Sequence, residues 1–330
     1  MLRVAVIGAG RIGRVHSRSV AAHPQAELSL ICDPIGTAAA DLAAEFGARS
    51  CLDAAEVFAD PDIDAVVIGS PSTLHAEQVL AAAKAGKAVL CEKPISISVE
   101  QGRQLEADLA AFEHPPVMVG FQRRFDPSMR KAHDLVARGA IGAVEQLAVF
   151  SRDPSAPPAS YVATSGGIFK DCTIHDFDIA RFFMGEVASV TAIGSNFNAD
   201  IKEAGDFDAV AVVVTAKSGA VAQITNNRHC AAGYDQRLEV HGETGSLMVD
   251  NQRPTMLTVN NAQHTAAQDP YLDYFLTRYI DAYRDELTAF IDAINNGTPV
   301  SPTVADGVAA LELAEAAAES AATGKTVHLG

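Results

Sequence analysis

The chain has 330 residues, of which 48% are apolar, and it carries a formal net charge of −16. This length favours two domains, and the apolar content excludes a largely disordered chain because each domain can bury a core. The acidic balance argues against nucleic acid or an anionic membrane surface as a partner, since phosphate groups require a basic face.

The first predicted strand, Leu2–Ile7, ends at a glycine-rich motif that leads into a predicted helix at Arg14–Ala22. The motif reads Gly8-Ala9-Gly10-Arg11-Ile12-Gly13. Such a motif between a strand and a helix is typical of a dinucleotide-binding Rossmann unit. Its first glycine permits the tight turn, the second lets the backbone approach the pyrophosphate, and the third lets the helix pack on the strand. The helix start then offers free N–H groups to the phosphates.

The second predicted strand, Glu27–Cys32, delivers Asp33 at its end, 20 residues after Gly13. A carboxylate at this separation accepts hydrogen bonds from the adenosine ribose and repels a 2′-phosphate. The following residues, Pro34–Thr37, supply no arginine or lysine to compensate. The sequence therefore predicts NAD rather than NADP as the cofactor. The alternative is that Asp33 only caps the next helix.

The alternation of strands and helices continues to about residue 120. The predicted strands are Asp64–Ile68, Lys87–Leu90 and Val117–Val119, and the predicted helices are Thr73–Lys84 and Val99–Ala111. Continuous apolar runs indicate strands that are covered on both faces, hence a parallel sheet. Because ligands bind at the carboxyl ends of such strands, the loops Ser70–Ser72 and Cys91–Pro94 are expected near the cofactor.

After Gly120 the pattern changes to longer strands that are joined in part by short glycine turns. The predicted strands are Val144–Phe150, Ala188–Gly194, Asp208–Ala216, Ala220–Asn226, Arg237–His241 and Ser246–Asp250, and helices at Tyr271–Ile294 and Thr303–Ala322 close the chain. Consecutive strands with hairpin turns indicate a mostly antiparallel sheet. The expected fold is α/β, with a doubly wound parallel Rossmann sheet at residues 1–120 and an α+β substrate-binding and oligomerisation domain at residues 121–330.

The strand Asp208–Ala216 is apolar on both of its faces. Helices of the same domain are expected to cover one face, and the other would be exposed in a monomer. An apolar sheet face of that size usually marks an interface, so we expect an oligomer with closed symmetry.

The segment at residues 165–181 stands apart from this scaffold. Its apolar residues suit a buried helix, and Asp171 and His175 are four residues apart, so they are expected to share a helix face. A carboxylate beside an imidazole orients the ring and tunes its pKa for proton transfer. A purely structural Asp–His pair is the alternative.

Neither disulfides nor a metal site is expected. The five cysteines are odd in number and scattered, at Cys32, Cys51, Cys91, Cys172 and Cys230. They show no zinc-ligand spacing. The chain begins with an apolar strand, without a signal-peptide pattern or a stretch long enough to span a bilayer. A cytoplasmic location is therefore expected.

Together these features resemble the Gfo/Idh/MocA oxidoreductase family, and within it the inositol 2-dehydrogenases, over essentially the whole length. Besides the Rossmann half, the resemblance is carried by the motif Glu92-Lys93-Pro94 and by four further segments. These are Gly120–Asp126, Ser151–Pro154, Gly166–Asp171 with Ile174–Asp176, and Gly233–Arg237.

The resemblance implies a role for individual residues. Lys93 is the catalytic lysine, and Asp171 and His175 are the carboxylate–histidine pair. In alcohol oxidation His175 takes the hydroxyl proton while Asp171 holds its tautomer, and Lys93 donates to the same oxygen and stabilises alkoxide charge. The hydride passes to NAD.

The remaining implied contacts concern the cofactor and the substrate. Cofactor contacts are expected from Gly8, Gly10, Arg11, Ile12, Gly13, Asp33, Ser70, Pro71, His75, Glu92, Lys93 and Arg123. Substrate contacts are expected from Lys93, Asp153, Asp171, His175 and Tyr234. For Arg123, Asp153 and Tyr234, ordinary ion pairs or core packing are the alternative, and His75 is interpreted as loop architecture rather than a catalytic group.

The expected function is NAD-dependent oxidation of myo- or scyllo-inositol to the keto-inositol by a cytoplasmic homotetramer. One alternative is an NAD-dependent aldose 1-dehydrogenase, including one for an unusual sugar such as L-glucose. A second alternative is a non-catalytic sugar or dinucleotide sensor. The intact set of Lys93, Asp171 and His175 argues against a sensor, since a regulator need not keep acid–base residues.

Overall fold

The computed structural model describes residues 1–162 and 164–330, together with the helical assignment of residue 163. The chain forms two compact units. Unit 1 contains Met1–Phe125 and Asp281–Glu312, and unit 2 contains Asp126–Ile280 and Leu313–Gly330. The expected division into residues 1–120 and 121–330 lacks this return of the chain to unit 1. An amphipathic helix near the C-terminus carries no pattern that says which sheet it covers.

Unit 1 is built on a six-stranded parallel sheet with the order β3-β2-β1-β4-β5-β6. The strands are β1 (Leu2–Ile7), β2 (Ala26–Cys32), β3 (Arg49–Cys51), β4 (Ala65–Ile68), β5 (Ala88–Glu92) and β6 (Val117–Gly120). This order is that of a Rossmann fold and confirms the predicted doubly wound sheet. The strand order reverses between β1 and β4, which is where such sheets bind ligands at their carboxyl ends.

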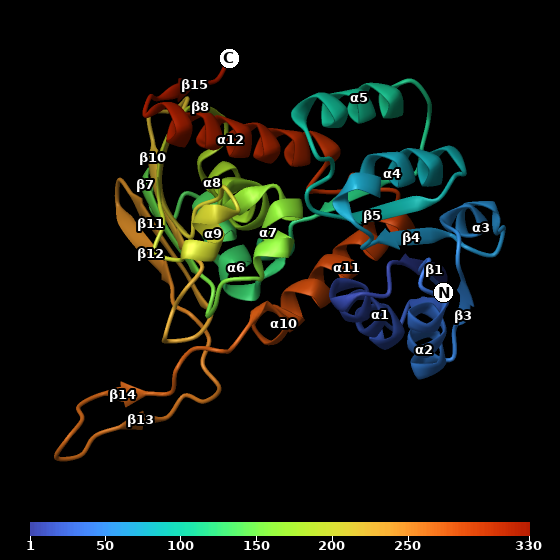
Figure 1. Cartoon of the computed structure of the whole chain (residues 1–330), viewed down its shortest axis with the longest axis horizontal. Coiled ribbons are helices and arrows are strands. Elements are labelled where there is room, and N and C mark those ends of the chain that lie inside the picture. Colours follow the sequence, from blue (N-terminus) through green and yellow to red (C-terminus); the bar gives the residue numbers. More distant parts are fainter. The chain divides into compact units, whose positions relative to one another are not determined.

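Helices cover both faces of this sheet. They are α1 (Arg11–Ala22), α2 (Gly36–Phe46), α3 (Ala54–Ala59), α4 (His75–Lys84), α5 (Val99–Ala110) and α11 (Ile280–Asn296), with 3₁₀ turns η1 (Ser72–Leu74) and η2 (Gln122–Phe125). The late helix α11 contributes Leu287, Phe290 and Ile291 to the core that contains Val4 and Leu90. Burial of these side chains is what brings α11, drawn in orange, back to the N-terminal sheet (Figure 1).

Unit 2 is built on a seven-stranded sheet with the order β12-β11-β7-β10-β9-β8-β15. The strands are β7 (Val144–Arg152), β8 (Val187–Ser195), β9 (Ala209–Ala216), β10 (Val221–Asn227), β11 (Asp235–Gly242), β12 (Gly245–Val249) and β15 (Val327–His328). All neighbouring pairs are antiparallel except β7 and β10, which run parallel. The mostly antiparallel sheet predicted from the sequence is thus confirmed.

The helices of unit 2 lie on one side of this sheet (Figure 1). They are α6 (Pro127–Ala137), α7 (Ala159–Ser165), α8 (Ile174–Met184), α9 (Ala199–Glu203), α10 (Phe275–Arg278) and the second half of α12 (Val304–Thr323), with a π-helical turn η3 (Phe169–Thr173) before α8. Side chains of α6, α8 and α12 join the inward face of the strands in one buried cluster. Along β9 burial alternates, so that Val212 is buried while its neighbour Val213 is 43% exposed.

The predicted helix at Tyr271–Ile294 is wrong at its start. The N–H groups of Tyr271 and Leu272 donate to the carbonyl oxygens of Ala232 and Gln252, so this backbone pairs with other segments and not with a helix turn. Helix α10 begins only at Phe275, and α11 follows it after Tyr279.

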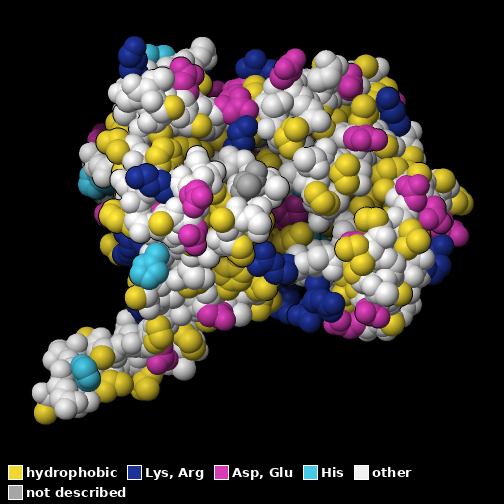
Figure 2. Space-filling view, viewed as in Figure 1, with side chains coloured by type: hydrophobic (Ala, Val, Ile, Leu, Met, Phe, Trp, Pro, Cys, Tyr) yellow, Lys and Arg dark blue, Asp and Glu magenta, His cyan; other side chains and the backbone are white. Residues whose placement is uncertain are grey.

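An unpredicted hairpin precedes these helices. Its strands β13 (Thr258–Val259) and β14 (Ala267–Gln268) project from unit 2 with apolar side chains on the surface, as Figures 1 and 2 show. Met256 at its base is 96% exposed. Within the described part of the chain, no helix is both long enough and apolar enough to cross a membrane.

Candidate active site

The glycine motif joins β1 to α1 in unit 1. Gly8 has a φ of +100°, and a Cβ there would lie 2.5 Å from the carbonyl oxygen of Gly69. A Cβ on Gly13 would overlap the carbonyl oxygen of Gly8, whereas the space around Gly10 is open to 4 Å. Gly10 is also the N-cap of α1. The loop therefore has the two close backbone contacts and the open helix start that a pyrophosphate requires.

Asp33 follows β2 and lies against this loop. Its Oδ2 accepts a hydrogen bond from the N–H of Ala9 at 2.8 Å, and its Oδ1 accepts one from the N–H of Ile35 at 2.8 Å. Each carboxylate oxygen keeps a further lone pair for a ribose hydroxyl. Arg11 is exposed and Ile12 is half-buried at the start of α1. This donor and acceptor set fits NAD.

The loops after β4 and β5 are joined by His75. Its Nδ1 lies 2.7 Å from the carbonyl oxygen of Pro94, and its Nε2 lies 2.9 Å from that of Ser70. Burial lowers the pKa of His75, while the two carbonyl contacts act in the opposite direction. Because both ring nitrogens are engaged by backbone, the contacts support a role in loop architecture. Pro71 is exposed beside Ser70, whose hydroxyl donates to Gln78 at 2.6 Å.

Glu92 is the last residue of β5 and directly precedes the half-buried Lys93. The carboxylate of Glu92 lies 2.7 Å from the Nε2 of His16, whose ring packs edge-on against Tyr283 at 5.5 Å. Behind this pair Glu286 of α11 is fully buried, and burial together with the charge of Glu92 raises the pKa of Glu286 well above its usual range. The residue before Lys93 is thus fixed within the core of unit 1.

Arg123 lies in the turn η2 after β6 and is 4% exposed. Its burial argues against a surface ion pair and agrees with core packing, which was the other alternative for this residue. The adjacent Arg124 pairs with Asp306 at 3.3 Å, within the same unit.

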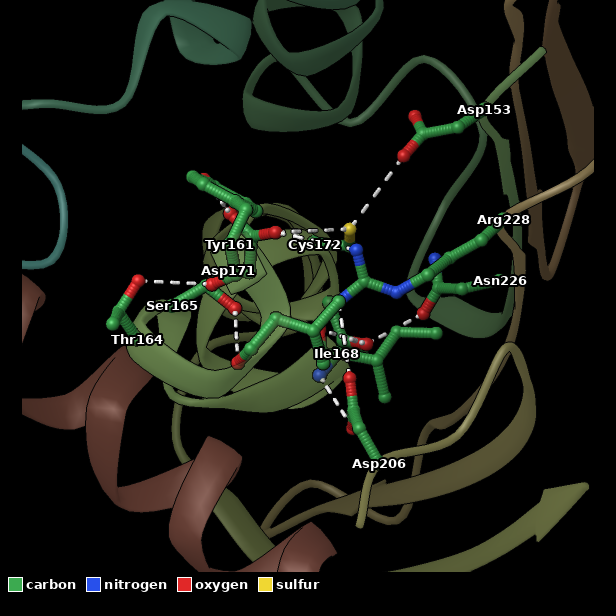
Figure 3. Close-up of polar contacts among 12 residues, drawn as sticks. Asp153, Tyr161, Thr164, Ser165, Ile168, Asp171, Cys172, Asp206, Asn226 and Arg228 are labelled. Atoms are coloured by element: carbon green, nitrogen blue, oxygen red, sulfur yellow. Dashed lines mark hydrogen bonds and ion pairs between the residues drawn. The ribbon is translucent and has the colours of Figure 1, made fainter. Parts of the chain in front are cut away.

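In unit 2 the turn η3 carries Asp171, and α8 begins with Ile174 and His175. Asp171 lies in the π-helical turn and His175 in the first turn of α8, so the predicted single helix is two elements. The hydroxyl of Tyr161 donates to the Oδ1 of Asp171 at 3.0 Å (Figure 3). Next to His175, Asp176 is fully buried and accepts from the hydroxyl of Ser151 at 2.7 Å, which fastens the start of α8 to β7.

A buried arginine completes the surroundings of Asp171. The Nη1 of Arg228 lies 3.4 Å from the Oδ2 of Asp171, and its Nη2 lies 3.2 Å from the Oδ2 of Asp206. The thiol of Cys172 is 3.8 Å from the Oδ2 of Asp153 and 3.9 Å from the Oδ2 of Asp171, so Asp153 and Asp171 belong to one cluster (Figure 3).

The surroundings of this cluster shift the pKa values of two groups beside it, Arg228 and Tyr161. Burial alone would lower the pKa of Arg228, but Cys172 and the neighbouring carboxylates together raise it. Partial burial of the hydroxyl raises the pKa of Tyr161, although the residue as a whole is 42% exposed, and Asp171 raises this pKa further. Arg228 therefore remains a cation, and Tyr161 remains a neutral donor.

Sequence reasoning did not find Tyr161, Asp206 or Arg228. Asp206 and Arg228 are remote in sequence from Asp171 and are brought to it by the fold, whereas Tyr161 lies only 10 residues before Asp171, just outside the segment at residues 165–181. The one available signal was an arginine directly after the strand β10, in the run Asn226-Asn227-Arg228.

Tyr234 lies before β11 in an aromatic cluster of unit 2. Its ring packs edge-on against Tyr274 and Tyr279, each with ring centroids 6.1 Å apart. Among the residues that the structure describes, no group of three His, Cys, Asp or Glu side chains is arranged to hold a metal ion.

Two family models match the chain. One is described as an oxidoreductase family, NAD-binding Rossmann fold, and matches residues 2–121; the other is described as the C-terminal alpha/beta domain of that oxidoreductase family and matches residues 133–329. Together they cover both sheets.

Individual relatives match over nearly their whole length. The inositol 2-dehydrogenase of Rhizobium meliloti (strain 1021) is 42% identical, covering 99% of this chain and 99% of that protein. A solved myo-inositol dehydrogenase from Corynebacterium glutamicum has a TM-score of 0.95 at 46% identity, covering 100% of this chain and 99% of that chain. The scyllo-inositol dehydrogenase from Lactobacillus casei, solved with bound NAD(H) and scyllo-inositol, has a TM-score of 0.93 at 32% identity, covering 99% of each chain.

Proposed function

Because this chain belongs to the Gfo/Idh/MocA oxidoreductase family, we propose that it oxidises myo- or scyllo-inositol to the corresponding keto-inositol with NAD. The observation that carries the substrate class is the full-length similarity to inositol dehydrogenases in both sequence and structure. Against it stand the aldose 1-dehydrogenase and the non-catalytic sensor, which no relative named here represents.

The chemistry of unit 2 supports a neutral polyol as substrate. Ring hydroxyls donate hydrogen bonds, and Asp153 and Asp171 present carboxylate acceptors beside the thiol of Cys172. The guanidinium of Arg228 is already paired with Asp171 and Asp206. An anionic substrate would meet a negatively charged cluster whose buried cation is engaged, so it would be repelled.

We assign three catalytic roles. His175 accepts the proton of the reacting hydroxyl, and Asp171 holds the tautomer whose unprotonated ring nitrogen takes that proton. Lys93 donates to the same oxygen and stabilises its developing negative charge. Bound NAD supplies the hydride acceptor. Asp153 and Tyr234 bind the other ring hydroxyls.

The cofactor is assigned to unit 1. The pyrophosphate binds at the glycine motif with Arg11 and Ile12, and Asp33 binds the adenosine ribose. The residues that line the nicotinamide half are Ser70, Pro71, His75, Glu92, Lys93 and Arg123. The open helix start at Gly10 and the fixed carboxylate of Asp33 support this assignment.

The substrate assignment is tested by a panel of inositols and aldoses, with NAD reduction followed by absorbance. We expect the highest kcat/KM with myo- or scyllo-inositol. A higher kcat/KM with an aldose would replace the assignment by an aldose dehydrogenase. Dinucleotide binding without turnover of any polyol would indicate a sensor.

We predict that NAD is preferred over NADP by well over an order of magnitude in kcat/KM, because a 2′-phosphate would place negative charge against Asp33. Asp33→Ala should erode this preference. Asp108→Ala is the matched control, since Asp108 is a half-buried carboxylate of α5 that accepts a hydrogen bond from the side-chain amide of Gln104 in the same helix at 2.8 Å. Comparable efficiency with NADP in the unmodified enzyme would refute the role of Asp33.

We further propose that the enzyme is a cytoplasmic homotetramer. The exposed face of the unit 2 sheet carries apolar side chains such as Ile193 (67% exposed) and Val213, which a second copy would cover. Light scattering at micromolar concentration should report about four times the mass of the 34.6 kDa chain. A monomer under these conditions would rule out the assembly.

A further inference from the structure

We propose that Arg228 is a positioning residue for the reaction, because its buried guanidinium fixes the orientation of the Asp171 carboxylate. The inference rests on the proposed function, in which Asp171 orients His175. Arg228 follows β10 in unit 2, is 1% exposed, and pairs with Asp171 at 3.4 Å and with Asp206 at 3.2 Å.

The backbone that carries Arg228 is rigidly held. Strand β10 lies inside the sheet, paired with β7 on one side and β9 on the other. The N–H of Arg228 itself donates to the carbonyl oxygen of Asp208 at 2.7 Å. Its guanidinium therefore starts from a fixed point, and its planar donors limit the directions from which a carboxylate can approach.

The second carboxylate, Asp206, fixes the other end of the arrangement. Its Oδ1 accepts a hydrogen bond from the N–H of Ile168 at 3.0 Å, directly before the turn η3. Gly167 has a φ of +82°, and a Cβ there would lie 2.9 Å from the same oxygen, so the loop is pressed against Asp206. Arg228 thus connects the carboxylate that holds the start of η3 with the carboxylate inside it (Figure 3).

The electrostatic surroundings explain why a cation is needed here. The groups that face Arg228 come from several elements and are acidic or neutral: Asp171 and Cys172 from η3, Asp153 after β7, and Asp206 before β9. On the far side of Asp171, Tyr161 of α7 donates to its other oxygen. Without Arg228, three carboxylates would share a partly buried site with no buried counter-charge from β10, and mutual repulsion would separate them.

Loss of this cation should change the pH dependence of the reaction. Removing a positive charge leaves the site more negative, so the base holds its proton more tightly and is unprotonated only at higher pH. The acid limb of the kcat/KM profile for oxidation should therefore move upward. Removing a nearby carboxylate instead has the opposite sign, because it makes the site less negative.

The test compares Arg228→Met, Arg228→Lys and Asp206→Asn in the full chain. We expect Arg228→Met to lower kcat by about 10- to 100-fold, the effect of misplacing a reacting group. Its acid limb should move upward by about 0.5 to 1 pH unit, with unchanged NAD affinity. Arg228→Lys should restore the pH limb, because it keeps the charge, but only part of kcat, because it lacks the planar fork. Asp206→Asn, the matched control, should lower the melting temperature without an upward pH shift.

Each outcome separates the inference from the proposed function. If both Arg228 variants only lower the melting temperature, with kcat and the pH limb unchanged, Arg228 has a purely structural role and the inference fails. Should Arg228→Met not fold, the kcat of Arg228→Lys decides. A partial loss of kcat supports the inference, and a full kcat overturns it. If Asp171→Asn itself retains full kcat, the proposed role of Asp171 fails first, whatever Arg228 does.

Discussion

His175→Ala is expected to lower kcat for inositol oxidation by about two to four orders of magnitude, the usual contribution of a positioned acid–base group. The affinity for NAD should stay nearly unchanged, because the assigned pyrophosphate and ribose contacts lie on the glycine motif and Asp33. Oxidation in the unmodified enzyme should also accelerate as pH rises through the pKa of the base, since only the unprotonated ring accepts the hydroxyl proton. Steady-state kinetics and NAD titration on the same preparation measure both quantities.

His133→Ala provides a control within the same unit. The ring of His133 stacks on Phe182 of α8 with centroids 3.6 Å apart, so its loss removes packing close to the helix that carries His175. This variant should lower the melting temperature and leave kcat unchanged. If His175→Ala behaves in the same way, with normal turnover and reduced stability, His175 is a structural residue and the mechanism lacks its base.

The cofactor half was largely predictable because its determinants are local in sequence. The glycine motif, the apolar strands on either side and the carboxylate of Asp33 lie within one strand–helix–strand unit, so spacing alone indicates how they meet. Neither the short strand β3 nor the return of α11 to unit 1 was predicted. The strand is only three residues long and largely exposed. The helix has an amphipathic pattern, but this pattern does not indicate which sheet the helix covers.

The substrate half was predictable only in part. The spacing of Asp171 and His175 drew attention to the right segment, but a π-helical turn ends between them and no periodicity in the sequence reveals it. The fold brings Arg228 to Asp171, which is 57 residues earlier in the chain, and to Asp206, which is 22 residues earlier. A charged residue after a strand usually faces solvent, so only the fold identifies Arg228 as buried.

Lys93→Met is expected to lower kcat by about two to three orders of magnitude, because it would remove the donor that we propose stabilises the alkoxide charge. Lys87→Met is the matched control. The ammonium of Lys87 is buried in the same unit and donates to the carbonyl oxygens of Asp60 at 2.7 Å and Ile63 at 2.8 Å. Its replacement leaves those two carbonyl oxygens without this donor, which should reduce the melting temperature without changing kcat.

The double variant of Lys93→Met with His175→Ala gives the sharper result. Two groups that act on one oxygen are not independent, so the combined loss in kcat should be smaller than the product of the two single losses. A combined loss equal to that product would mean that the two side chains act on separate steps. Full turnover in Lys93→Met, with Lys87→Met behaving as a stability variant, would remove Lys93 from the reaction, and another donor would then have to stabilise the alkoxide.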